Sequence, residues 1–198
     1  MKLWEKLLGL ALAEMPDVAS GVLAAHVVFG YAPIWQAHTW IEAKHQLTAY
    51  ILGSIIAVLP DFDFLFAKKP ERLEELSGEH RTIAHHPVLT IPALAIVLGT
   101  FSWEWAVIAI LAMAAHYVDD SFDEKGVQWH YPIYPNHFEF LRDGQLLKIR
   151  TPKDVQKNPP PQLQEWLEQS FLRICWRSVG YTLYTLAAII TVLALKGG

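Results

Sequence analysis

Histidine and aspartate residues stand at the ends of the most apolar segments of this 198-residue chain. The clearest pair is His116 and Asp120, which follow an uncharged run and are four positions apart. On a helix, residues at this spacing share a face, so an imidazole and a carboxylate there can bind one metal ion. An aspartate near the C-terminus of a helix opposes the helix macrodipole. We interpret this cost as a sign of function.

Two other segments carry the same residue types beside apolar stretches. Their candidates, in chain order, are Asp61, Asp63, His80, His85 and His86. An alternative for the turn at Asp61 and Asp63 is that an aspartate caps a short following helix, a role that suits Asp63 better than Asp61. One histidine of the adjacent pair His85 and His86 is expected to point away from any ion. Imidazole and carboxylate ligands together suit zinc or another first-row divalent ion.

The rest of the sequence predicts an all-α fold, a helical bundle that forms a single domain over residues 1–198. Strand signals are scarce, and the polar, proline-containing stretch 120–160 is expected to be an irregular loop, either a lid over the site or a plain linker. Hydrophobic periodicity and the positions of proline and glycine delimit the helices. They are expected over residues 3–14, 18–30, 40–59, 71–76, 88–103, 105–119 and 161–195.

Short loops between consecutive helices make those helices antiparallel neighbours. In such an up-and-down bundle, Asp61, the histidines of residues 80–86, and the pair His116 and Asp120 reach the same end. The opposite turn carries only Glu104 as a charged residue. This convergence predicts one metal site, built from three separate segments of the chain.

The composition favours a membrane setting. Hydrophobic residues make up 53% of the chain and charged residues 18%, which is more apolar than a typical soluble domain. A membrane span needs about 20 apolar residues, and residues 178–195 form a candidate transmembrane segment. We expect several apolar helices to be membrane-embedded, and a soluble bundle is the alternative. The net charge of −4 disfavours nucleic-acid binding.

Most lysines and arginines lie on the side of the bundle that carries the predicted site, whereas the other side has mainly Lys196. By the positive-inside rule, the site then faces the cytoplasm from the inner membrane. The single cysteine, Cys175, excludes an internal disulfide and a cysteine-based zinc site. Any metal must therefore be held by histidine and carboxylate.

As a set, the motifs resemble a known family over about residues 20–135. The family is the YdjM-like membrane-bound metal-dependent hydrolases, which are distantly similar to zinc-dependent phospholipase C, an all-helical enzyme. The matching motifs are His26, Leu59-Pro60-Asp61-Phe62-Asp63, His80-Arg81-Thr82-Ile83-Ala84-His85-His86 and His116-Tyr117-Val118-Asp119-Asp120.

The resemblance implies a ligand set. Asp61, His85 or His80, His116 and Asp120 would share one metal, and Asp120 would bridge to a second metal that is also held by His26. Asp61 and Asp120 would be the catalytic carboxylates, and Arg81 would orient an anionic substrate. For the third metal of the phospholipases, the only candidates are His130, His137 and Glu139.

The reaction implied by the resemblance is hydrolysis of a phosphoester or a lipid-like substrate by metal-activated water. One or two divalent ions, most plausibly zinc, would be the cofactor, and membrane lipid would be the partner. A second interpretation is a membrane di-iron oxygenase or desaturase, because His80, His85 and His86 resemble one histidine box. A third is a non-catalytic membrane protein in which a metal staples helix ends together.

Overall fold

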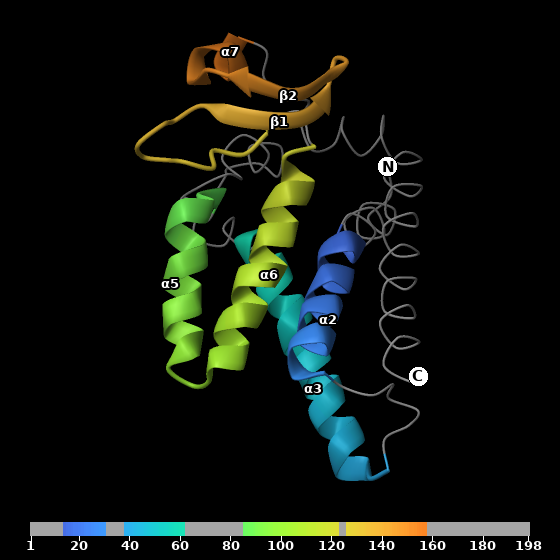
Figure 1. Ribbon diagram of the computed structural model, residues 1–198. Coiled ribbons are helices and arrows are strands. Elements are labelled where there is room, and N and C mark those ends of the chain that lie inside the picture. Colours follow the sequence, from blue (N-terminus) through green and yellow to red (C-terminus); the bar gives the residue numbers. More distant parts are fainter. Residues whose placement is uncertain (1–13, 31–37, 62–84, 123–125, 158–198) are drawn as a thin grey trace, which may run out of the picture.

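The computed structural model describes residues 14–30, 38–61, 85–122 and 126–157. Within these residues the chain forms a group of four helices, with a small antiparallel sheet and a short helix beyond one end of it (Figure 1). The elements are α2 (Met15–Phe29), α3 (Trp40–Val58), α5 (Pro87–Gly99), α6 (Trp103–Asp120), β1 (His137–Arg142), β2 (Gln145–Arg150) and α7 (Pro152–Lys157).

Local sequence signals set the ends of these helices. Pro16 occupies the first turn of α2, where its missing N–H is tolerated. The helix ends at Gly30, whose φ of 61° is the left-handed conformation that glycine adopts readily. The N-cap of α3 is Thr39, whose hydroxyl accepts a hydrogen bond from the backbone N–H of Glu42. The helices expected over residues 18–30, 40–59, 88–103 and 105–119 are confirmed, although α2 begins three residues earlier than expected.

Helix α6 is the centre of the bundle. It lies between α5 on one side and the pair α2 and α3 on the other, and it contacts all three (Figure 1). Its buried face carries Ile108, Ala109, Ala112 and Met113, which pack into the core with alanines of α2 and α3. The central helix therefore brings His116 and Asp120 to the end of the bundle where α2 begins and α3 ends.

Helices α2 and α3 approach each other closely at Gly21 and Gly53. A Cβ atom at Gly21 would lie 2.3 Å from the carbonyl oxygen of Gly53, and one at Gly53 would lie 2.4 Å from the carbonyl oxygen of Gly21. Only glycine permits this contact between two backbones. The crossing fixes the start of α2 relative to the end of α3.

The expectation that residues 120–160 form an irregular loop is wrong, and the fold is mainly rather than wholly α-helical. Strands β1 and β2 pair antiparallel, with Phe140 opposite Leu147 in the register. Their turn contains Asp143 and Gly144, which have φ values of 51° and 77°. An Asp-Gly pair with positive φ at both residues is a strong hairpin signal. The expectation of few strand signals did not take this pair into account.

Among the described residues, none of the helices combines the length and the apolar character needed to cross a membrane. The expected helices at 3–14, 71–76 and 161–195, with the candidate transmembrane segment 178–195, lie outside the described residues.

Candidate metal centre

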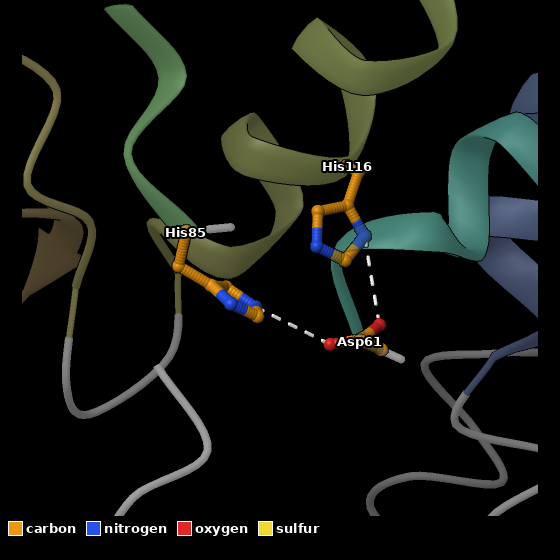
Figure 2. Close-up of side chains that lie close together, drawn as sticks. All are labelled: Asp61, His85 and His116. Carbon is orange, nitrogen blue, oxygen red and sulfur yellow. Dashed lines mark ion pairs between the residues drawn. The ribbon is translucent and has the colours of Figure 1, made fainter. Parts of the chain in front are cut away.

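Three side chains from different parts of the bundle meet at one end of it. Asp61 ends the short turn that follows α3, His85 precedes α5, and His116 lies in the last turns of α6. Their candidate ligand atoms all lie within 4.8 Å of one another. Figure 2 shows Asp61 between the two histidines, with each carboxylate oxygen directed at a different ring.

The separations in this group suit a metal ion better than direct hydrogen bonds. His85 Nε2 lies 3.4 Å from Asp61 Oδ1, and His116 Nδ1 lies 3.7 Å from Asp61 Oδ2. Hydrogen bonds between nitrogen and oxygen are usually 2.7–3.2 Å long. Ligands placed about 2.0–2.1 Å from a tetrahedral ion are about 3.3 Å apart. The donor types and their spacing therefore fit a zinc-like ion.

Asp120 joins the same cluster from α6. Its Oδ2 lies 3.5 Å from His85 Nε2 and 3.7 Å from His116 Nε2. The structure thus brings together four of the predicted ligands, namely Asp61, His85, His116 and Asp120. Their binding of metal stays a prediction.

Sequence reasoning missed two acids that lie against this cluster. Asp17 Oδ2 is 3.2 Å from His116 Nδ1, and Glu14, Asp17 and Asp61 form a second group whose oxygen atoms lie within 4.8 Å of one another. Both acids fall at or beyond the end of the helix expected over residues 3–14 and before the one expected over 18–30. The available signal was a pair of acids three positions apart, around a proline that can begin an apolar helix.

Burial and mutual repulsion shift the pKa values of these groups. Burial first, and then the carboxylates of Asp61 and Asp17, raise the pKa of Glu14 to about 9. Burial raises the pKa of Asp17 to about 6, although His116 opposes this shift. Burial alone would lower the pKa of His116, but Asp61, Asp120 and Asp17 outweigh it and raise that pKa to about 10. Without a metal, Glu14 and His116 therefore hold protons at neutral pH.

The unforeseen sheet fastens the end of α6 that carries the cluster. The hydroxyl of Ser121 donates to the carbonyl of Tyr117 over 2.8 Å, and the indole N–H of Trp129 donates to that hydroxyl over 2.9 Å. The backbone N–H of Phe140 donates to the carbonyl of Ser121 over 2.6 Å. On the α5 side, the hydroxyls of Tyr117 and Thr90 are 2.6 Å apart. These bonds hold the helix end in a fixed orientation.

His26 is not brought to the cluster. It lies nine residues after Asp17 on α2, which corresponds to about 14 Å along the helix. Its Nδ1 is 2.8 Å from the hydroxyl of Tyr50, and its side chain is buried. This is the environment of a hydrogen-bonded core histidine.

The other candidates are dispersed. His86 stacks on Tyr131, with ring centroids 4.0 Å apart, as expected if one histidine of the adjacent pair points elsewhere. Buried Glu139 pairs with Arg150 across the hairpin. His130 packs on Phe138, and His137 Nε2 is 3.1 Å from Gln128 Nε2. Asp63, His80 and Arg81 lie outside the described residues.

Comparison with known proteins identifies the family. The model of the YdjM inner membrane protein family matches residues 22–194, which is most of the chain. No curated protein and no solved structure matches the chain. The expected similarity to phospholipase C and the hydrolytic activity therefore remain proposals, whereas the location in the inner membrane follows from the family. The chain belongs to the YdjM family of inner membrane proteins.

Proposed function

We propose that this protein is a metal-dependent hydrolase of the inner membrane that acts on a phosphoester, most plausibly a lipid-like one. Asp61, His85, His116 and Asp120 would hold a zinc-like ion. The observation that carries the proposal is the set of nitrogen–oxygen separations of 3.4–3.7 Å among these four side chains. They come from three segments of the bundle.

The environment of His116 supports an ion at this position. Its side chain is 1% exposed, and neither ring nitrogen meets hydrogen-bond geometry with any group in the described part of the chain. Buried polar groups in proteins are almost always satisfied. Both nitrogens instead face carboxylate oxygens, so a cation bound to one nitrogen, with the other nitrogen as an N–H donor, would satisfy the imidazole and the acids together.

A divalent ion in this group would activate a water molecule as the nucleophile and stabilise negative charge on the attacked group. The chain's own contribution is orientation. Asp61 presents one oxygen to each histidine (Figure 2). Asp120 faces both rings from the end of α6, the helix that also carries His116. The hydrogen bonds of Tyr117 and Ser121 keep the end of α6 in position. Such supporting bonds commonly change metal affinity by about 10–100-fold.

An apolar cavity next to the cluster supports a lipid-like substrate. It has a volume of about 290 Å³ and is lined by residues of α5 and α6 and of the turn that follows α3 and leads to Asp61. The lining residues are Leu59, Pro60, Thr90, Ala93, Leu94, Val97 and Met113. A hydrocarbon chain in this cavity would place the attached phosphoester near the ends of the same helices. The family's location in the inner membrane gives access to such substrates.

The test begins with the full-length protein purified in detergent. Its metal content is measured by mass spectrometry, and hydrolysis is followed with bis(4-nitrophenyl) phosphate and with phospholipid vesicles. We expect bound zinc-like metal and turnover in the wild type, and loss of both in His116→Ala. Glu104→Gln, at the opposite end of α6, is the control and should retain both.

Three outcomes would contradict the proposal. Iron without hydrolysis would favour the oxygenase interpretation. A tightly bound ion without turnover of either substrate would favour a non-catalytic protein in which the metal holds helix ends together. Absence of metal from the wild type, with His116→Ala unchanged in stability, would remove the basis for a metal centre.

A further inference from the structure

We infer that Glu14 and Asp17, together with Asp61, form a second metal site that selects a hard divalent cation such as Mg²⁺, Mn²⁺ or Ca²⁺. Asp61 would then be shared between this site and the histidine-containing site. The inference rests on the proposed function, because it extends the same metal centre. It differs from the ligand set implied by the family resemblance, in which Asp120 and His26 held the second ion.

The geometry of the three acids is set by helix packing rather than by a flexible surface loop. Glu14 is the N-cap residue of α2 and Asp17 lies in its first turn, while Asp61 follows the end of α3. The close crossing at Gly21 and Gly53 fixes these two helices against each other. One oxygen from each acid therefore lies within 4.8 Å of the other two.

A buried imidazole aimed into the acidic group provides a second, independent observation. His116 is 1% exposed and comes from α6, a third helix. Its Nδ1 lies 3.2 Å from Asp17 Oδ2 and 3.7 Å from Asp61 Oδ2, without a hydrogen bond of suitable geometry in the described residues. His116, a proposed ligand of the first site, is thus also directed toward the second.

The charges of these groups call for a cation. Asp17 is only 7% exposed and lies in one group with Glu14 and Asp61. Carboxylates this close repel one another when ionised, and burial makes each charge more costly. A divalent ion among their oxygens removes both penalties at once. Paired ions about 3.5–4 Å apart are a common arrangement in hydrolytic sites.

The donor types decide which cation each site prefers. The second group offers only carboxylate oxygens, which suit Mg²⁺, Ca²⁺ and Mn²⁺. The first group offers two imidazoles and two carboxylates, which suit zinc. We therefore expect the two sites to differ in selectivity although they share Asp61.

The experiment uses metal-stripped, full-length protein titrated with Zn²⁺ and then with Mn²⁺. Zinc is measured by mass spectrometry and bound manganese by electron paramagnetic resonance. We expect wild type to bind one ion of each kind. Glu14→Gln/Asp17→Asn should retain zinc affinity within about 10-fold and lose at least about 100-fold in Mn²⁺ affinity. His85→Ala should instead lose at least about 100-fold in zinc affinity and retain Mn²⁺ affinity within about 10-fold.

Controls keep a folding defect separate from loss of the site. The single variant Glu14→Gln is nearly isosteric and should weaken Mn²⁺ binding alone, with an unchanged circular dichroism spectrum. Glu104→Gln should bind both ions as wild type does.

The outcomes distinguish this inference from the proposed function. A wild type that binds one zinc ion and no Mn²⁺ overturns the second site, while the hydrolase proposal stands. Mn²⁺ binding that is unchanged in Glu14→Gln/Asp17→Asn overturns the assignment of these acids. A wild type that binds neither ion contradicts both proposals.

Discussion

Two groups of buried acids in this protein are neutralised in different ways. In the hairpin, Glu139 is 1% exposed and Arg150 Nη1 lies 2.9 Å from its Oε1, an ordinary charge-assisted hydrogen bond. At the helix ends, Asp17 and Asp61 face His116 at 3.2 and 3.7 Å. The hairpin acid, Glu139, is paired with a cationic side chain of the protein, Arg150. The helix-end acids face a histidine instead, and we propose that a cation from outside completes their neutralisation.

The two groups also differ in what assembles them. Glu139 and Arg150 lie on adjacent, directly paired strands, so the hairpin alone brings them close. The helix-end group needs α2, α3 and α6 to pack correctly before its members meet. A local ion pair of the first kind serves stability. A group assembled from distant segments, at the cost of burying acids together, is typical of a functional site.

Asp61→Asn should have the largest effect, because Asp61 belongs to both candidate ligand groups. We expect it to remove one ion and weaken the other, and to reduce hydrolysis by about 100-fold or more. Metal analysis and turnover measured on the same sample check this. Retention of both ions at wild-type affinity would show that the helix-end acids are not ligands, and the contrast with the hairpin would disappear.

Arg150→Met tests whether the ion pair of the hairpin serves stability alone. It leaves Glu139 buried without its cation, which should lower the free energy of unfolding by about 3 kcal/mol. Metal content should stay within about threefold of wild type. The matched control is Lys148→Met, which removes a more exposed pair with Asp143 and should change the free energy of unfolding far less. Loss of metal in Arg150→Met would mean that the hairpin also shapes the site.

The helix-end histidine site could be predicted because its residue types are unusual where they stand. His116 and Asp120 end an apolar helix, and Asp61 and His85 border two others. Bundle connectivity then brings these ends together. His26 was included through the resemblance, but its position nine residues along α2 from Asp17 takes it away from the cluster and beside Tyr50.

The hairpin and the two additional acids could not be found by periodicity. Asp143-Gly144 is a local turn signal, but the strands beside it are short, and such strands depend on tertiary packing more than on propensity. Glu14 and Asp17 adjoin Pro16, which marks the end of one helix as readily as the start of the next. Only the crossing of α2 with α3 reveals that these acids reach Asp61.

Gly21→Ala should disturb the helix-end group without touching any of its side chains. The added Cβ would lie 2.3 Å from the carbonyl oxygen of Gly53, so α2 and α3 must separate. We expect a loss of about 1–3 kcal/mol in the free energy of unfolding and weaker metal binding. Gly99→Ala is the matched control, because its Cβ would meet only Ala106 Cβ at 3.4 Å. Equal effects of the two substitutions would contradict the role of the crossing.

A pH dependence of stability should arise from the helix-end group and not from the hairpin. The pKa of Glu14 is raised from 4.5 to about 9, and that of His116 from 6.5 to about 10. Over pH 6.5–9, each folded group therefore holds a proton that the unfolded chain has already released. Stability falls with rising pH wherever the folded state binds more protons. The metal-free protein should therefore melt at lower temperature as the pH rises through this window.

Bound metal should reverse this trend, because ligands must lose their protons to bind and higher pH then favours the complex. Melting curves over pH 6.5–9, recorded in chelator and in excess metal, measure both slopes. His116→Gln should flatten the slope in chelator, because it removes the imidazole that titrates there. Glu139→Gln changes the hairpin acid and should leave the slope intact. A melting temperature that is constant or rises with pH in chelator would show that the helix-end acids are neutralised within the chain, as Glu139 is.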